Sequence, residues 1–384
     1  MSIDAAPFTI SIGDEVIADL HDRLDRTRWT DAATVDDWSQ GAPLAYVQDM
    51  CRYWRAQYDW TARQAVLNRY PQFTMTLDGE GDEPLDVHFV HLRSSAPDAT
   101  PLILTHGWPG SFVEFLDVVG PLTDPAGHGA AGAPAFHVVV PSLPGFGFSG
   151  RPRRPGWGVE RIATAWDQLM VALGYDRYYA QGGDWGAIVT TAIGIQARGH
   201  CAGIHVNMPV AFPTPEDFVD ATPEELAIAG RLGYYDTTES GYAKQQATRP
   251  QSLGYGLVDS PVAQAAWILE KFYTWTDNDG APEDAVDRDR MLDNVMVYWL
   301  TATATSSARL YWESMGSMPA GQVLVPSGIS QFPKDIIAAS RRWSERVYAD
   351  LRYWNVLEQG GHFAAMEEPD LFVAELRAWA QAIS

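Results

Sequence analysis

Cysteine is scarce in this sequence, whose 384 residues include only Cys51 and Cys201. One disulfide bond between them is arithmetically allowed, but two cysteines do not make a disulfide framework. Structural disulfides persist mainly in secreted proteins, because cytosolic thiols are kept reduced. The cysteine content therefore favours a reducing compartment, and we expect a cytoplasmic protein.

Positive charge and long apolar runs are also lacking. The chain has 27 Lys and Arg residues against 49 Asp and Glu residues, which gives a formal net charge of −22. Nucleic acids and anionic membrane surfaces repel a protein this acidic. No apolar run approaches the ~20 residues of a membrane span, and residues 1–20 lack the basic start of a signal peptide. We expect neither nucleic acid nor a membrane as a partner.

The remaining composition is that of a large globular protein. Hydrophobic residues make up 46% of the chain, which is ample for a core. A length of 384 residues predicts one large domain with additions, or two domains. Residues 1–75 place apolar side chains such as Ile17, Leu20 and Leu24 at helical spacing. They predict an N-terminal helical elaboration that packs on the core.

Strand patterns begin near residue 73 and then alternate with helical patterns. Period-two alternation on both sides of a glycine turn predicts a hairpin of residues 73–77 and 85–91. Short apolar runs typical of buried strands follow at 102–105, 137–140, 177–180 and 203–207, with an amphipathic helix at 159–173. This alternation predicts an α/β fold with a doubly wound, mostly parallel sheet, whose first half spans residues 76–207.

The alternation breaks between residues 208 and 318, which are mainly helical in character. Strand patterns return at 322–325 and 351–357, and an amphipathic helix at 369–382 follows. Residues 319–384 therefore predict the second half of the core. An insertion between the two halves lies over the carboxyl ends of the strands, where ligands bind in such sheets. We interpret residues 208–318 as a helical cap, or lid.

The segment 181–187, Gln-Gly-Gly-Asp-Trp-Gly-Ala, has the layout of a nucleophile elbow. A short strand, a turn of small residues and a helix hold one side chain above the sheet in this arrangement. The central position, which is commonly Ser, is Asp184 here. A carboxylate is already anionic at neutral pH and can displace at a saturated carbon to form an ester. The alternative is that Asp184 only caps the helix that follows.

A second turn, His-Gly-Trp-Pro-Gly at 106–110, follows the predicted strand 102–105. In this kind of fold, such a turn aims a backbone N–H at the oxyanion of the reaction. The predicted donors are the N–H groups of Trp108 and of Trp185, the residue after the nucleophile. The alternative is a tight turn without a catalytic role.

His362 lies in a glycine turn between the last predicted strand and the last helix. The chain order nucleophile, acid, histidine is the one expected for this arrangement. Asp335, which follows the strand predicted at 322–325, is our candidate for the acid that orients His362. Asp335 could equally cap a helix that begins at Ile336, and Glu358 and Glu367 lie nearer to His362 in sequence.

Opening a cyclic ether leaves an alkoxide, which a tyrosine hydroxyl can protonate. The cap segment offers candidates throughout its length, and the residues alone do not choose among them: Tyr234, Tyr235, Tyr242, Tyr255, Tyr273, Tyr298 and Tyr311. Most buried tyrosines are simply packed, with a hydrogen-bonded hydroxyl.

The chain resembles the microsomal-type epoxide hydrolases of the α/β-hydrolase superfamily over almost its whole length. The resemblance rests on motifs at 23–29, 53–60, 106–111, 182–186, 259–261, 269–272 and 360–369. It implies an N-terminal epoxide hydrolase domain, a cap with the paired tyrosines Tyr242 and Tyr311, and Asp335 as the orienting acid. Some relatives carry Glu at that position. Membrane-bound relatives begin with an anchor helix that is lacking here, so we expect a soluble bacterial member of actinomycete type.

The resemblance implies hydrolysis of an epoxide to a vicinal diol. Asp184 would form an ester, and water activated by His362 would hydrolyse it, without a metal or an organic cofactor. The alternatives are a haloalkane dehalogenase and a catalytically silent ligand-binding protein on the same scaffold. The expected partners are a small epoxide, water and a second copy of the chain in a homodimer. The epoxide would be bulky, apolar or aryl-bearing, and either a natural product or a xenobiotic.

Overall fold

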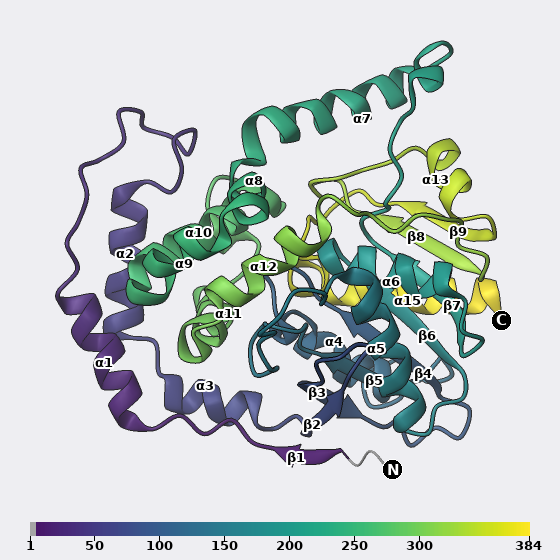
Figure 1. Ribbon diagram of the computed structural model, residues 1–384, viewed down its shortest axis with the longest axis horizontal. Helices are drawn as coiled ribbons and strands as arrows, with labels where there is room; N and C mark the ends of the chain where they lie inside the picture. Colours follow the sequence, from purple (N-terminus) through teal and green to yellow (C-terminus); the bar gives the residue numbers. More distant parts are fainter. Residues whose placement is uncertain (1–4) are drawn as a thin grey trace.

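The computed structural model describes residues 5–384. Residues 1–4, the start of the predicted N-terminal elaboration, lie outside the described residues. Figure 1 shows a twisted sheet flanked by helices, a group of helices above one end of the sheet, and N-terminal helices that run along the side of both. No helix among residues 5–384 is both long and apolar enough to cross a lipid bilayer.

Within residues 5–384 the strands form one nine-stranded sheet, in the order β1-β2-β3-β5-β4-β6-β7-β8-β9. The strands are β1 (Ala6–Phe8), β2 (Gln72–Leu77), β3 (Leu85–Leu92), β4 (Thr100–Thr105), β5 (Phe136–Pro141), β6 (Tyr178–Gly182), β7 (Cys201–Val206), β8 (Ser327–Gln331) and β9 (Leu351–Val356). The pairings from β5 through β4 to β9 are parallel, and those from β1 to β3 and β5 are antiparallel. The predicted α/β fold with a mostly parallel sheet is confirmed.

Helices cover both faces of this sheet. Those that belong to it are α4 (Leu116–Thr123), α5 (Val159–Ala172), α6 (Asp184–Gln196), α13 (Arg341–Val347), α14 (Ala364–Glu367) and α15 (Pro369–Ile383), with the 3-10 helix η1 (Phe112–Phe115). Helices α5 and α6 pack together on one face, and α4 and α15 pack together on the other (Figure 1). The central strands are consequently buried on both sides, which explains their nearly continuous apolar runs.

The connection from β7 to β8 carries the helices that lie above the sheet (Figure 1). They are η2 (Pro215–Phe218), α7 (Pro223–Tyr234), the π-helix η3 (Tyr235–Glu239), α8 (Gly241–Thr248), α9 (Pro250–Asp259), α10 (Pro261–Trp275), η4 (Pro282–Asp284), α11 (Arg288–Thr301) and α12 (Ala304–Ser314). Proline occupies the first position of α7, α9 and α10, where its missing N–H costs no helical hydrogen bond. This segment is the predicted cap.

One predicted strand was wrong. Residues 322–325 form no strand; Val323 makes only an isolated bridge to Tyr348, and the strand β8 begins after Pro326. The error arose because β8 reads Ser-Gly-Ile-Ser-Gln, which is too polar for a typical buried strand. Its polar side chains have partners inside the protein, since Ser330 donates to Glu375 at 2.6 Å.

The N-terminal part is less purely helical than predicted. It contains α1 (Asp14–Asp25), α2 (Leu44–Ala56) and α3 (Trp60–Leu67), but its first described element is the strand β1. Strand β1 pairs with β2 in antiparallel fashion and so extends the edge of the main sheet. An apolar pattern did not reveal it because β1 is only three residues long.

A buried ion pair joins these N-terminal helices to the cap. Asp293 of α11 is fully buried and accepts hydrogen bonds from Arg63 of α3, one of them at 2.9 Å to Nε. The hydroxyl of Tyr58 donates to the same carboxylate at 2.8 Å. Burial raises the pKa of Asp293, and Arg63 opposes that shift. The contact therefore fixes α11 relative to the N-terminal part.

We expect Asp293→Ala to lower the free energy of unfolding by about 3 kcal/mol, because it leaves Arg63 and Tyr58 without a buried partner. The measurement is urea denaturation followed by tryptophan fluorescence. The matched control is Asp289→Ala on the same helix, where the half-exposed carboxylate accepts one hydrogen bond from Tyr53. It should cost less than about 1 kcal/mol. Equal losses in both variants would contradict the assignment.

Candidate active site

Asp184 occupies the sharp turn between β6 and α6 that the sequence predicted. Its backbone φ of 50° lies in the left-handed region, where a residue with a side chain is strained by about 1–2 kcal/mol. The turn is possible because Gly186 lets α6 approach the end of strand β4. A Cβ at Gly186 would collide with the carbonyl group of Thr105. The strained turn lifts the Asp184 carboxylate above the carboxyl end of the sheet.

The turn after β4 provides the first partner of this carboxylate. The backbone N–H of Trp108 donates to Oδ1 of Asp184 at 2.7 Å. Gly107 makes this approach feasible, since a Cβ at that position would collide with the carboxylate. One predicted oxyanion donor therefore already holds an oxygen of the predicted nucleophile. The N–H of Trp185 lies in the first turn of α6, where it has no intrahelical acceptor.

His362 lies on the other side of Asp184. Its Nε2 is 3.5 Å from Oδ2 of Asp184, and its Nδ1 is 2.7 Å from Oδ1 of Asp335. All three side chains are buried. The main chain of His362 is anchored through a hydrogen bond from its N–H to the carbonyl of Trp275, at 2.8 Å. The structure thus brings together the nucleophile, histidine and acid predicted from residues far apart in the chain.

The protonation of His362 depends on these two carboxylates. Burial alone would lower the pKa of the imidazole, but the nearby charges of Asp335 and Asp184 outweigh burial and hold the pKa well above its ordinary value. The ring is therefore positively charged at neutral pH when both carboxylates are ionised. Its Nδ1–H donates to Asp335, which directs Nε2 toward Asp184.

The alternatives for the acid have other roles. Glu367 accepts hydrogen bonds from the backbone N–H groups of Phe363, at 2.9 Å, and Asp277, at 2.8 Å, so it braces the turn that carries His362. Burial raises the pKa of Glu367 to about 7. Glu358 is exposed. Asp335 does not cap a helix at Ile336, since α13 begins later, at Arg341.

Tyr242 of α8 and Tyr311 of α12 lie above Trp108. The ring of Tyr242 stacks on the Trp108 ring at 5.0 Å between centroids, and the ring of Tyr311 stands edge-on to it at 6.0 Å. The two tyrosine rings are 5.8 Å apart. The predicted tyrosine pair therefore faces the side of the site on which Trp108 and Asp184 meet.

The two tyrosine hydroxyls differ in their partners. The Tyr242 hydroxyl is 2.8 Å from the hydroxyl of Tyr235. The Tyr311 hydroxyl is buried and has no partner within 3.5 Å in hydrogen-bonding geometry among the described residues, although the side chains of Tyr242 and Trp185 lie beside it. Burial, with the Asp184 charge nearby, raises the pKa of both Tyr242 and Tyr311 well above the ordinary value, so both remain protonated donors. An unpartnered buried hydroxyl indicates a position for an oxygen of a bound molecule.

Trp275 and Glu114 lie at the site but were not singled out from the sequence, and Tyr235 was only one of the cap tyrosines considered as proton donors. Tyr235 contacts Tyr242, Trp275 packs against His362 at 4.9 Å between ring centroids, and the carboxyl of Glu114 lies against Gly110. Burial, reinforced by the charge of Asp184, raises the pKa of Glu114 to about 8. Glu114 had a weak sequence signal, since it is one of two acidic residues in the otherwise apolar run 112–119.

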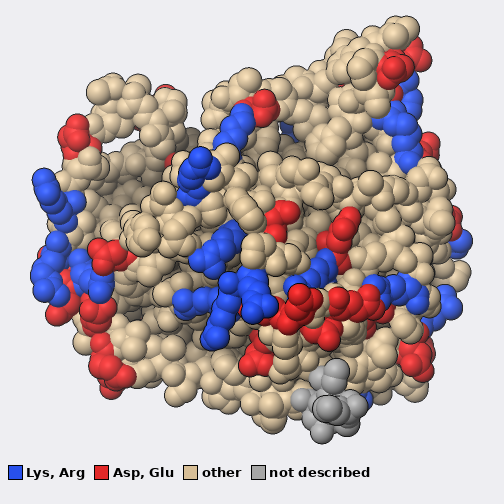
Figure 2. All heavy atoms as spheres, viewed as in Figure 1, with Lys and Arg blue, Asp and Glu red and all other residues tan. Residues whose placement is uncertain are grey.

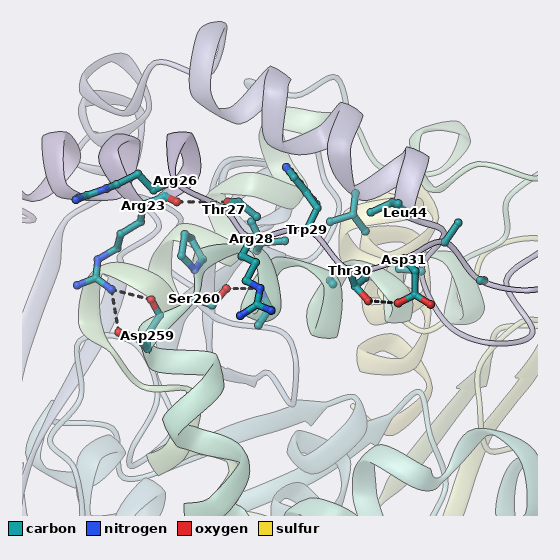
Figure 3. Close-up of a pocket in the computed structure, with 18 of the residues that line it drawn as sticks. Arg23, Arg26, Thr27, Arg28, Trp29, Thr30, Asp31, Leu44, Asp259 and Ser260 are labelled. Atoms are coloured by element: carbon teal, nitrogen blue, oxygen red, sulfur yellow. Dashed lines mark hydrogen bonds and ion pairs between the residues drawn. The ribbon is translucent and has the colours of Figure 1, made fainter.

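Of two large cavities in the surface, one adjoins the site and the other does not. A pocket of about 800 Å³ is lined by Tyr235, by Trp275, which packs against His362, and by Asp335. A different pocket of about 940 Å³, between α1, α2 and α10, contains none of them. Figure 3 shows that Arg23 in this second pocket already reaches Asp259. This second pocket lies where the N-terminal part meets the cap.

Comparisons with known proteins agree with this geometry. The family model "Epoxide hydrolase N terminus" matches residues 5–115, and the model "alpha/beta hydrolase fold" matches residues 100–234. The chain is 51% identical over 372 residues to a Stigmatella aurantiaca (strain DW4/3-1) protein provisionally named an epoxide hydrolase. This match covers 97% of this chain and 83% of that protein. It is 35% identical over 401 residues to Epoxide hydrolase 1 of Sus scrofa, with 97% and 87% covered.

A solved structure extends the comparison to three dimensions. The crystal structure of juvenile hormone epoxide hydrolase from the silkworm Bombyx mori superposes with a TM-score of 0.91 at 31% identity. The match covers 99% of this chain and 95% of that chain. The sheet, the cap and the N-terminal part are therefore all shared with that structure.

We expect Asp184→Ala to lower the pKa of His362, because the variant lacks one of the two carboxylates that stabilise the imidazolium. The measurement is an NMR titration with ring-labelled histidine, in which His362→Gln identifies the resonance. Asp259→Ala, which removes an exposed carboxylate far from the site, should leave the pKa unchanged. A pKa that stays constant or rises in Asp184→Ala would contradict the pairing.

Proposed function

The chain belongs to the epoxide hydrolase family, and we propose that it hydrolyses its epoxide through a covalent ester on Asp184. The observation that carries the proposal is the position of the Asp184 carboxylate, held between the Trp108 N–H and His362 at the head of the elbow. One carboxylate oxygen is bound by a backbone donor, so the other is available as the nucleophile.

In the first step, Oδ2 of Asp184 attacks a ring carbon of the epoxide and the bond from that carbon to the ring oxygen breaks. The oxygen leaves as an alkoxide and takes a proton from Tyr311 or Tyr242. The unpartnered hydroxyl of Tyr311 supports this role, because it can donate to the epoxide oxygen without breaking an existing hydrogen bond. The hydroxyl of Tyr235 can help to return a proton to Tyr242.

Ester formation changes the charge around His362. Asp184 becomes neutral, so one of the two charges that raise the pKa of His362 disappears and the pKa falls. The imidazole can then give its proton back, directly or through water, to the tyrosinate that the first step leaves, and so serve as a base. Asp335 remains ionised beside Nδ1 and keeps the ring oriented. The first step thereby prepares the base for the second.

In the second step, His362 takes a proton from a water molecule, which attacks Cγ of the ester. The carbonyl oxygen becomes an oxyanion, and the N–H groups of Trp108 and Trp185 stabilise it by ~3–4 kcal/mol per donor. Collapse of the intermediate breaks the bond from Cγ to the substrate oxygen. The departing alkoxide takes the proton of the hydroxyl that water added to Cγ, which releases the diol and leaves His362 protonated as at the start. Asp184 returns to its ionised form.

The surroundings support an epoxide of substantial size. The 800 Å³ pocket beside the site has aromatic walls that include Trp38, Tyr235, Tyr273 and Trp275. We infer that residues 208–318 act as the lid of this pocket and that residues 1–75 support the lid. A cytoplasmic location and a homodimer also belong to the proposal, and light scattering of the purified protein tests the dimer.

We expect Tyr311→Phe to lower kcat/KM for an epoxide by about 100-fold, since a positioned acid contributes at least that much. The same change should not lower the melting temperature, because the hydroxyl it removes has no partner in the structure. Steady-state kinetics and calorimetry measure the two effects. A loss of activity with an equal loss of stability would point to a packing role instead.

We expect His362→Gln to accumulate the ester, because the base of the second step is missing. Intact-protein mass spectrometry after mixing with aryl and aliphatic epoxides should give a mass gain equal to the whole epoxide. The double variant His362→Gln with Asp184→Ala is the matched control and should show no gain.

The same experiment distinguishes the alternatives. A gain equal to a haloalkane less hydrogen halide, seen only with haloalkanes, would instead support a dehalogenase. The ester route also places an oxygen of water in the Asp184 carboxylate. If multiple turnovers in isotopically labelled water left Asp184 unlabelled, the ester route would be excluded.

A further inference from the structure

A third pocket, which contains none of the residues in the proposed mechanism, is lined by a cluster of arginines. It measures about 870 Å³ and lies between the loop before α5, the junction of α8 and α9, and α12. The arginines are Arg151, Arg153, Arg154, Arg249 and Arg309. Figure 2 shows Lys and Arg side chains gathered near the centre of this face of an otherwise acidic molecule. We call these five residues the arginine pocket.

None of the five arginines of the arginine pocket forms an ion pair with a carboxylate of residues 5–384. Several arginines elsewhere do, such as Arg342, which contacts Asp220 at 2.7 Å and Glu225 at 2.8 Å. A chain with 49 acidic residues against 27 basic ones offers many carboxylates. The pocket nevertheless gathers five positive charges without an ion pair.

Two acidic residues near the arginine pocket, Glu83 and Glu313, already accept hydrogen bonds from backbone N–H groups. Glu83 accepts hydrogen bonds from the N–H groups of Arg153, at 2.9 Å, and Arg154, at 3.1 Å. Both oxygens of Glu313 accept from the N–H of Gly156, at 3.1 and 3.0 Å. These carboxylates fix the shape of the loop and leave the arginine side chains free to bind an anion. Against the five arginines, only Glu313 adds negative charge to the lining.

The arginine side chains that form hydrogen bonds have only neutral partners. Arg309 reaches the carbonyl of Pro152 at 3.4 Å and the side chain of Gln251 at 3.3 Å, both at the long limit for a hydrogen bond. Arg249 donates to the carbonyl of the preceding residue, and Arg151 donates to the carbonyl of Thr301. Most of the guanidinium donors therefore remain available.

The walls of the pocket suit a ligand with a planar part. Trp312 lines the pocket and is 51% exposed, while Trp157, which also lines it, is buried. Prolines at 144, 152, 155 and 250 stiffen the surround. The volume falls within the range of small-molecule sites, which is ~300–1,000 Å³. A smaller pocket of about 470 Å³ shares Arg151 and Arg309 and extends the basic surface toward Arg23.

We propose that the arginine pocket binds a small molecule that carries phosphate groups. Guanidinium groups bind phosphate oxygens through paired, charge-assisted hydrogen bonds, and several converging arginines favour more than one phosphate. The indole of Trp312 can stack on a planar part of the same molecule. The site is separate from the one at which the epoxide reacts.

The placement links the pocket to catalysis. Arg309 and Trp312 flank Tyr311 in α12, and Arg249 follows directly after α8, which carries Tyr242. The pocket contacts α12 and the end of α8, the two helices that carry the tyrosines. A bound phosphate compound therefore touches both of these helices.

The test is isothermal titration of the full chain with pyrophosphate at low ionic strength. We expect binding that weakens by about tenfold in Arg154→Gln and again in the double variant with Arg309→Gln, since each removes a charged hydrogen-bond donor. Arg177→Gln is the matched control, because it removes one exposed arginine that lies outside the pocket. Circular dichroism verifies that each variant is folded.

The remaining outcomes overturn the proposal. If Arg177→Gln weakened pyrophosphate binding as much as Arg154→Gln does, the anion would be attracted by the overall positive charge of the arginines and not bound in the pocket. No heat with pyrophosphate or with tripolyphosphate would exclude a phosphate pocket. Binding only to vesicles of phosphatidylglycerol, and to neither free phosphate compound, would assign the cluster to a lipid surface.

Discussion

The active site depends on a single constraint, which is that the buried carboxylate of Asp184 must be compensated. A buried charge is strongly unfavourable unless hydrogen bonds and opposite charge surround it. Here the Trp108 N–H binds one oxygen and the His362 ring faces the other. These groups come from turns after β4, β6 and β9, and Asp335 follows β8. A parallel sheet brings the carboxyl ends of these strands to one edge, so the fold itself supplies the compensation.

The N-terminal part, residues 5–75, matters to the site through its contacts with the cap. It holds the cap through the buried pair of Arg63 and Asp293 and through the stacking of Trp38, which lies between α1 and α2, on Tyr273, at 4.0 Å between ring centroids. The cap in turn carries Tyr242 and Tyr311. The distance of these two tyrosines from Asp184 is therefore set partly by contacts outside the core.

Short-range patterns predicted the centre of the site, and long-range packing determined the rest. The elbow around Asp184 and the glycine turn of His362 are local, because each needs small residues beside the functional one. The choice of Tyr242 and Tyr311 among the cap tyrosines came from resemblance, since their ring contacts with Trp108 join residues far apart in sequence. Strand β8 was misplaced because its polar residues are satisfied by tertiary partners such as Glu375. Trp275 had no local signal, and nothing local distinguished Tyr235 from the other tyrosines of the cap.

The site keeps two features that disfavour folding and favour reaction. Asp184 has a strained backbone, and the Tyr311 hydroxyl is buried without a partner. An unsatisfied buried hydroxyl costs about 1–3 kcal/mol, and strain adds a similar amount. The cost of the unsatisfied hydroxyl is recovered when an oxygen-bearing molecule lies between the tyrosines and the carboxylate, because the hydroxyl then gains an acceptor. In the mechanism that we propose, the resting protein holds Tyr311 and Asp184 ready, and binding of the epoxide relieves that penalty as the reaction begins.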